Sequence, residues 1–317
     1  YILNMANFDF NPDYLEDYVP KKIIPLPIYS LIFHSITYLI SGEYSFVIIE
    51  YFSIFLFLYI FSKILRELNI NIYFSIIFAL GVFLLPDFVV LLKQLKINFI
   101  NLDIIKNLYS FRIPRPIISN IYFFWGLLLA IYFHKYRNNN YFFILIGINL
   151  ALNFGSVFYN FVTLSVLFFI LFLYEYLKSD KDFFLYFIKK VFITTIFFFI
   201  FSLPFIIILF FSEEDYLLRV GAFHPSFDQR KILLSYILLN FLSFKFLLTI
   251  FVNTFFLFFL LKKQNFFCKK TIIVLYLFFI SSCISPILFV SFSPTLSEIY
   301  HFIDLIIVTG ILLFFIF

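Results

Sequence analysis

The sequence repeatedly returns to apolar runs that are long enough to cross a lipid bilayer. A membrane-spanning helix needs about 20 mostly apolar residues, and about 17 is the practical minimum. The chain has 317 residues, of which 63% are hydrophobic and only 13% are charged. A soluble chain carries about 25% charged residues, so the composition excludes a string of soluble modules. It predicts one all-α, polytopic transmembrane domain over residues 1–317.

We predict nine membrane spans. The run 141–177 is too long for one span, and we divide it at Asn153 and Gly155. The chain begins at Tyr1 without a methionine and ends at Phe317 inside an apolar run, so we interpret it as a fragment. The spans are expected at 44–65, 72–92, 118–133, 141–153, 156–177, 191–211, 246–261, 271–290 and 302–317.

The apolar segment 23–41 is harder to place, because two prolines disturb its start and His34 lies in its middle. Cytoplasmic loops carry an excess of Lys and Arg. The segment must stay on the outer face if all the cation-rich links are to be cytoplasmic, so we predict an interfacial or re-entrant helix there. An ordinary span is the alternative, and it would put Lys63 and Arg66 outside. The cation-rich links are 66–71, 134–140, 178–190 and 262–270.

The remaining connecting segments lie on the predicted outer face. Three of the four are longer than any cation-rich link, and together they hold most of the acids. Binding and catalytic residues concentrate on loops that a rigid scaffold positions, so we expect function on this face. These outer segments are the first segment 1–43 and the loops 93–117, 212–245 and 291–301.

The first outer segment contains four acids within nine residues, namely Asp9, Asp13, Glu16 and Asp17. Asn11 followed by Pro12 matches an N-cap and a first helical position. Asp13 and Asp17, four residues apart, would then share one helix face. Such carboxylates can act as a general base, bind a cation or simply be solvated.

The loop 93–117 ends in RIPRP, in which Arg112 and Arg115 alternate with two prolines. The planar guanidinium of arginine matches the oxygens of a phosphate. This stiff corner is therefore a candidate phosphate site, and contact with lipid headgroups is the alternative that the same chemistry allows.

The other outer loops and the first span supply further candidates. Arg219 and His224 lie among acids and bases, a mixture that suits a polar substrate or a solvated loop. His301 lies three residues before Asp304, so the two would share a helix face. Glu50 lies roughly 9 Å below the outer end of its span by helical rise. Acids inside spans are candidates for function.

The order of these features resembles that of bacterial GT-C glycosyltransferases. An acidic outer segment leads into KKIIPLPIYSLIFHSITYLISGEYSFVIIEYFSIFLFLYIFSKIL. This stretch is similar to the family's Pro-rich "yPPLYP"-like start of a juxtamembrane helix, which ends at a glycine, here Gly42, before a long span. RIPRPIIS resembles the Arg/Pro segment before a later span, and EDYLLRVG and IYHF match weaker patterns. The likeness covers most of the chain and is most specific over 20–65.

The resemblance implies transfer of a sugar from a polyprenyl-phosphate-linked donor to a glycan, lipid or protein acceptor. It implies a GT-C-like fold in the bacterial inner (plasma) membrane, with the active face extracytoplasmic, and no nucleic-acid partner. The family's catalytic acid lies in the first outer loop. Here that implies Asp9 or Asp13 as the base, and Glu16 and Asp17 are the other acids at that location.

The resemblance also assigns the departing lipid phosphate to Arg112 and Arg115, with Arg219 or His301 as further contacts. His224 and Glu50 are further candidates for substrate binding. No DxD motif occurs in the predicted outer segments, so participation of a divalent cation stays open, and no other cofactor is implied.

Three other functions fit a polytopic chain. An O-antigen polymerase-like or ligase-like enzyme would have one dominant outer loop, whereas the polar residues here are spread over four outer segments. A transporter or flippase would have polar residues in the middle of several spans, whereas these spans are almost wholly apolar. A membrane subunit without chemistry is the third alternative.

Overall fold

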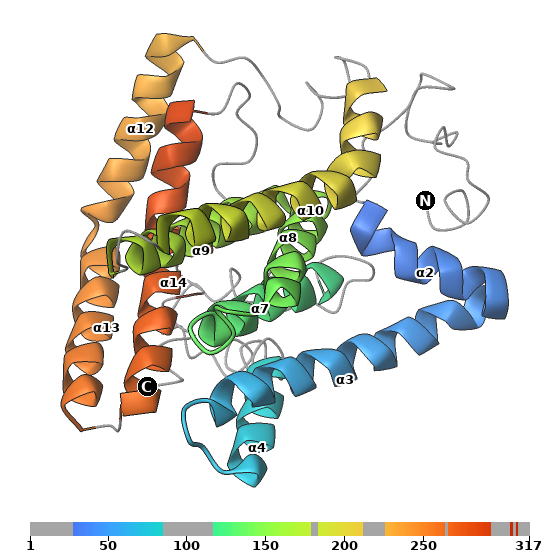
Figure 1. The fold of residues 1–317 in the computed structure, drawn as a ribbon, viewed down its shortest axis with the longest axis horizontal. Helices are drawn as coiled ribbons and strands as arrows, with labels where there is room; N and C mark the ends of the chain where they lie inside the picture. The colour runs from blue at the N-terminus through green and yellow to red at the C-terminus, as the bar shows by residue number, and fades with distance from the viewer. Residues whose placement is uncertain are drawn as a thin grey trace, which may run out of the picture.

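The computed structural model describes residues 28–84, 117–178, 183–211, 226–263, 266–292, 305–306 and 309. Every element in these residues is a helix, and no β-strand occurs among them. The all-α prediction is therefore confirmed for the described part of the chain (Figure 1). The helices are α2 (Ile28–Ser41), the 3-10 turn η1 (Gly42–Tyr44), α3 (Ser45–Arg66), α4 (Ile72–Phe83), α7 (Ile117–Tyr132), α8 (Asn140–Phe154), α9 (Phe158–Lys178), α10 (Phe183–Phe211), α12 (Phe227–Phe241), α13 (Phe244–Lys263) and α14 (Phe266–Phe292).

The helix bounds agree closely with the predicted apolar segments. The helices α3, α7, α8, α9 and α13 match predicted spans to within two residues at each end, and α10 and α14 extend beyond theirs. The predicted break at Asn153 and Gly155 is the turn between α8 and α9. The predicted spans 72–92 and 302–317 extend outside the described residues.

Within the described residues, four helical stretches are long and apolar enough to cross a membrane. A fifth is added if α12 and α13, which are bent by 58° at their junction, form one broken span. The helices α4, α7 and α8 are apolar but shorter. The described helices thus account for four or five of the nine predicted spans. The four stretches are Ile28–Arg66, Phe158–Leu177, Phe187–Phe211 and Lys269–Ser291.

Gly42 separates α2 from α3. Its φ of 58° lies in the left-handed region, which glycine adopts at little steric cost. The 39 residues of Ile28–Arg66 would be about 58 Å long as one straight helix, whereas the bilayer core is about 30 Å thick. The break lets the chain turn back, so that α2 and α3 form a V (Figure 1). The expected helix end at Gly42 is confirmed, and the interfacial position of α2 stays a prediction.

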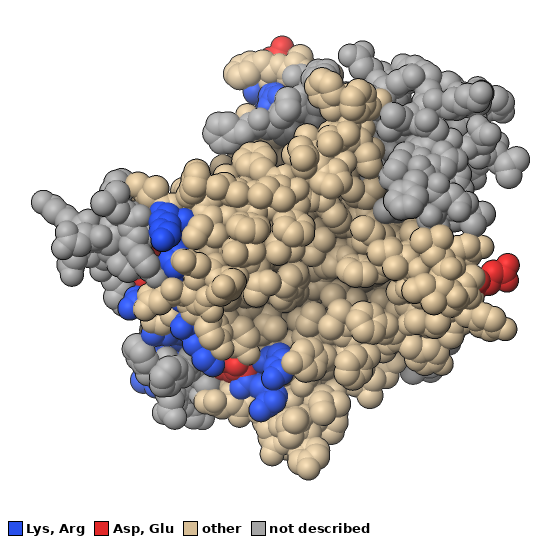
Figure 2. Space-filling view, turned by 45° about the vertical axis from the view of Figure 1, so that its right-hand side comes forward, with Lys and Arg blue, Asp and Glu red and all other residues tan. Residues whose placement is uncertain are grey.

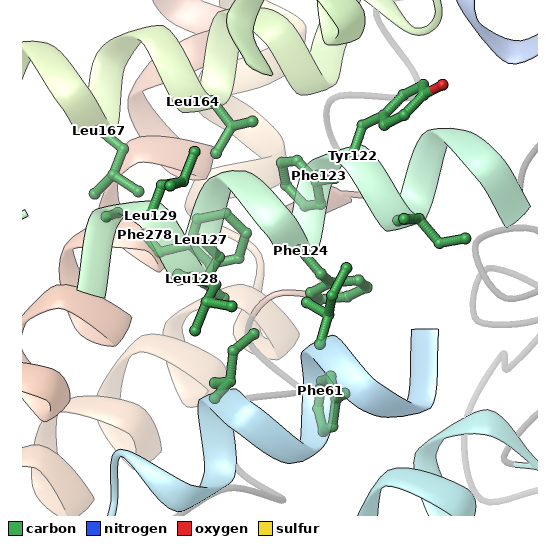
Figure 3. Packing of buried hydrophobic residues seen from close by; sticks show 14 of the residues in the cluster. Phe61, Tyr122, Phe123, Phe124, Leu127, Leu128, Leu129, Leu164, Leu167 and Phe278 are labelled. Atoms are coloured by element: carbon green, nitrogen blue, oxygen red, sulfur yellow. The ribbon is translucent and has the colours of Figure 1, made fainter. Parts of the chain in front are cut away.

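The helix α7 lies at the centre of the apolar core (Figure 3). Its Phe124 ring packs edge-on against Phe57 and Phe61 of α3, with ring centroids 5.6 Å apart in both pairs. On another side, Phe123 packs 4.9 Å from Phe278 of α14. A helix that is buried on most sides fixes its neighbours, so α7 sets the positions of α3, α8, α9 and α14.

The helix α12 lies in the segment that the sequence analysis assigned to an outer loop, 212–245. Its start is a capping box: the Ser226 hydroxyl accepts from the Gln229 backbone N–H at 3.3 Å, and the Gln229 side chain accepts from the Ser226 N–H at 2.8 Å. The segment therefore contains a helix over 227–241, and its position outside the membrane stays a prediction. The charged first turn resembles a loop, but apolar residues follow it and continue the helix.

The helices α12 and α13 run one after the other along α14 (Figure 1). Ile237 of α12 is buried with Phe289 and Val290 of α14. The Arg230 guanidinium donates to the carbonyl groups of Val290 at 3.0 Å and Ser291 at 3.3 Å. Carbonyl groups at a helix end lack partners within the helix, so Arg230 ties α12 to the last turn of α14.

Candidate functional site

The sequence analysis named ten candidate site residues, and Glu50 is the only one of them within the described residues. It lies on α3 with a half-buried side chain, about 8 Å along the helix from Ser45. The other candidates precede or follow described helices in the sequence, so we describe the site from the ends of those helices. The nine candidates outside the described residues are Asp9, Asp13, Glu16, Asp17, Arg112, Arg115, Arg219, His224 and His301.

Two side-chain hydrogen bonds join the first turns of α2 and α7. The hydroxyl groups of Ser30 and Ser119 lie 3.1 Å apart, and both side chains are buried. The Tyr122 hydroxyl donates to the carbonyl of Tyr29 at 2.7 Å. In the sequence, α2 follows the acidic segment and α7 follows the RIPRP corner. The α2–α7 junction therefore brings together the two helix starts to which these segments are attached.

A chain of hydrogen bonds continues from this junction into α8. The Asn149 amide donates to the Tyr122 carbonyl at 2.8 Å, and the Asn153 amide donates to the Asn149 carbonyl at 2.9 Å. Both asparagines are completely buried. A buried amide costs free energy unless it is paired, and a carbonyl partner shows which end of each amide is the donor. The chain thus joins α2, α7 and α8 through polar groups.

Several buried polar atoms of α2, α3, α8 and α9 have no hydrogen-bond partner. Most buried polar groups in folded proteins are paired, and leaving one unpaired costs about 1–3 kcal/mol. The atoms are the hydroxyls of Tyr29 and Ser45, both ring nitrogens of His34, and the side-chain oxygens of Asn153 and Asn160.

Gly155 lets α2 approach the turn between α8 and α9. A Cβ atom at this position would lie 2.3 Å and 2.6 Å from two carbons of the Tyr29 ring, so a larger residue would displace the tyrosine. Asn153 lies in the last turn of α8 and accepts from the Val157 N–H at 2.9 Å through its backbone carbonyl. Asn160 lies in the first turn of α9. Three helices therefore meet at this turn.

His34 is a buried polar residue that the sequence analysis noted only as an interruption of an apolar segment. It lies one turn after Ser30, on the same face of α2. Its ring packs against Phe46 of α3, with centroids 4.5 Å apart and planes tilted by 59°. The sequence signal was available, because a histidine in an apolar run needs a partner or a function. Its unpaired state is visible only in the structure.

A second polar cluster lies at the other ends of α7 and α9. The buried Glu175 carboxylate lies 2.8 Å from His134 Nδ1 and accepts from Arg137 at 3.2 Å. The Lys190 ammonium group, also buried, donates to the Asn140 side chain at 2.5 Å. A cavity of about 20 Å³ between them, which Phe133 and Phe143 also line, has room for one water molecule. These contacts hold neighbouring helices together, so we interpret the cluster as structural.

The same cluster includes the link after α3, because the Tyr132 hydroxyl donates to Glu67 at 2.8 Å. Three of the four predicted cytoplasmic links therefore meet at one end of α7. Most of the Lys and Arg side chains visible in Figure 2 gather on one side of the surface. In the described residues, these links carry charged contacts that join α3, α7, α8, α9 and α10.

Among the described residues, no three His, Cys, Asp or Glu side chains gather into a group that could hold a metal ion. The acids expected near a divalent cation lie outside these residues. The chain matches no family model, no curated protein and no solved structure. The GT-C resemblance therefore rests on the sequence features alone.

Proposed function

We propose that this protein is a membrane glycosyltransferase that moves a sugar from a polyprenyl-phosphate-linked donor to an acceptor on the extracytoplasmic face. The observation that carries the proposal is the α2–α7 junction, where Ser30 meets Ser119 at 3.1 Å. In such a reaction, a base and a phosphate-binding cation must act on the two sides of one anomeric carbon. The junction joins the helix after the acidic segment to the helix after the arginine corner.

The sequence supports this arrangement for one arginine. Arg115 lies four residues before Ser119 and two residues before the start of α7. We propose that its guanidinium group contacts the phosphate beside the junction.

The charge distribution supports the proposed orientation. The polar cluster around Glu175 lies at the end of α7 where the cation-rich links meet. The positive-inside rule assigns such links to the cytoplasm. The α2–α7 junction lies at the opposite end of α7. The apolar faces of α2 and α3 suit a polyprenyl tail, since Phe33, Tyr51 and Phe55 are exposed. We propose that the reaction takes place on the side of the junction, at the outer surface of a bacterial inner membrane.

The proposed chemistry is a substitution at the anomeric carbon. The carboxylate of Asp9 or Asp13 takes the proton of an acceptor hydroxyl as its oxygen attacks that carbon. The bond from the carbon to the phosphate oxygen breaks, and the lipid phosphate leaves with the electron pair. Arg112 and Arg115 stabilise the departing phosphate charge. Further substrate contacts are proposed for Glu16, Asp17, Glu50, Arg219, His224 and His301.

The test is transfer of labelled sugar in membranes that contain the full chain and a panel of polyprenyl-phosphate-linked sugars. We expect the double variant Asp9→Asn/Asp13→Asn to lose about 100-fold or more in rate, since general-base catalysis contributes about that much. Asp228→Asn is the matched control, because this carboxylate is 87% exposed and only loosely paired with Lys231 at 3.8 Å.

Two results would count against the proposal in different ways. Equal transfer by the double variant and the unmodified protein would reject these acids as the base. Absence of transfer from every donor of the panel would reject the function itself.

A further inference from the structure

A patch of cations lies where the link after α7 meets the start of α10. The link 134–140 and the residues 183–190 together contain four cations and no acid. The Lys190 ammonium group donates to the Asn138 carbonyl at 3.2 Å and to the Asn140 side chain at 2.5 Å, so it holds the two segments together. The four cations are Lys135, Arg137, Lys189 and Lys190.

Two of these cations lie beside the contact that joins the segments. Arg137 precedes Asn138 in the chain, and Lys189 precedes Lys190. The Arg137 side chain donates to the buried Glu175 carboxylate at 3.2 Å and is still 45% exposed. The Lys189 side chain is exposed as well. Both cations can therefore contact an anion at the surface of the protein.

Tyrosine side chains surround the remaining exposed cation, Lys135. Its ammonium group lies 5.6 Å from the centre of the Tyr132 ring and 5.4 Å from that of Tyr136. Tyr136 is 39% exposed, and Tyr141 at the start of α8 is 77% exposed. Tyrosine is enriched at the membrane–water interface, at the level of the lipid headgroups. The composition of the patch is typical of that level.

An exposed apolar stripe on α10 begins at the patch. Its residues follow Lys189 at intervals of three or four positions, so they share one face of the helix with that lysine. From Lys189 to Leu203 this face is about 21 Å long by helical rise, whereas one leaflet of the hydrocarbon core is about 15 Å thick. The stripe is therefore long enough for an acyl chain. It consists of Phe192, Ile196, Phe199 and Leu203, which are all exposed.

The patch and the stripe together fit an amphiphile with a negative headgroup. Lys and Arg side chains bind phosphate oxygens, and basic sites at membrane helices bind anionic lipid headgroups. A free phosphate would use the cations and leave the stripe uncovered. A zwitterionic phospholipid would cover the stripe but bring a positive group to the cations.

We infer that Lys135, Arg137 and Lys189 bind the phosphate of an anionic phospholipid whose acyl chain lies along the apolar stripe of α10. The patch lies at the end of α7 opposite to the α2–α7 junction. This lipid is therefore distinct from the proposed sugar donor, and the inference does not depend on sugar transfer.

The test measures lipid binding to the purified full chain by native mass spectrometry. The protein is titrated with phosphatidylglycerol or with phosphatidylcholine of the same acyl chains, and we expect the anionic lipid to bind about tenfold tighter. The double variant Lys135→Gln/Lys189→Gln should weaken phosphatidylglycerol binding about tenfold or more, since each lysine near anionic lipid contributes roughly a factor of five. Phosphatidylcholine binding should not change. Both lysines are exposed, so the melting temperature should not change either.

The matched control is Lys231→Gln/Lys262→Gln, which removes the same charge from exposed positions of α12 and α13. It should bind phosphatidylglycerol as tightly as the unmodified protein. Equal weakening by the two double variants would show a general effect of charge and would overturn the inference. Equal affinity of the unmodified protein for the two lipids would overturn it as well.

A competition experiment distinguishes a lipid headgroup from a free phosphate. Inorganic phosphate at the concentration of the lipid should leave phosphatidylglycerol bound, because it makes no contact with the stripe. Displacement of the lipid would show that the patch takes free phosphate and would reject the lipid site. None of these measurements uses sugar transfer, so the inference and the proposed function fail separately.

Discussion

A buried polar side chain in this protein is either paired or without a partner, and the two states have opposite consequences for stability. The Ser119 hydroxyl is paired with Ser30 at 3.1 Å, whereas both ring nitrogens of His34 lack a partner. Both His34 and Ser119 lie beside the α2–α7 junction. Removing a paired group leaves its partner without a hydrogen bond and destabilises the protein. Removing an unpaired group eliminates the desolvation penalty of that group and does not destabilise the protein.

We therefore expect Ser119→Ala to lower the free energy of unfolding by about 1 kcal/mol. His34→Leu should leave that free energy unchanged or raise it by about 1 kcal/mol, because the apolar side chain has no polar atoms to leave unpaired. Thermal unfolding of the two purified variants in the same detergent measures both effects. A marked loss of stability in His34→Leu would show that the histidine nitrogens are paired.

At the scale of the helices, the sequence predicts the elements better than it predicts their contacts. Apolar runs between polar links locate α3, α7, α8 and α9, although α7 and α8 are shorter than a full span. The start of α12 was also predictable, since Ser226 followed three residues later by Gln229 is a capping-box pattern. The polar chain from Tyr122 to Asn153 was not predictable, because it joins residues that are brought together only by packing between helices.

The close crossing of α8 and α10 gives a prediction at this scale. A Cβ atom at Gly147 would lie 2.5 Å from the carbonyl oxygen of Thr194 and 3.0 Å from the backbone nitrogen of Phe198. Backbone atoms cannot rotate away, so Gly147→Ala must separate the two helices. We expect it to lower the free energy of unfolding by about 1–3 kcal/mol, as overpacking does.

Gly81→Ala is the matched control for this substitution. No atom lies within 4 Å of a Cβ at position 81 of α4, and alanine favours helix over glycine by about 1 kcal/mol. The control should therefore be neutral or stabilising in the same unfolding measurement. Equal effects of the two substitutions would contradict the close crossing at Gly147.

The whole-molecule claim is that α2 stays on the outer side of the membrane while α3 crosses it. Single cysteines at two exposed positions test it, in a chain whose Cys268 and Cys283 are replaced by serine. Glu43→Cys should react with an impermeant thiol reagent added outside intact cells. Arg66→Cys should react only after the cells are opened, because we propose that the cation-rich end faces the cytoplasm. Outside labelling of Arg66→Cys would show that α2 crosses the membrane.

The central claim is that the α2–α7 junction serves the transfer of a lipid-linked sugar, and the most direct measurement compares two cations. One is Arg115, four residues before Ser119, and the other is Lys262, exposed at the end of α13. We expect Arg115→Ala to lower sugar transfer from polyprenyl phosphate in membranes by about 100- to 1,000-fold, as loss of a transition-state donor does. Lys262→Ala should transfer at the unmodified rate. Equal rates in the two variants, or no transfer by the unmodified protein, would contradict the claim.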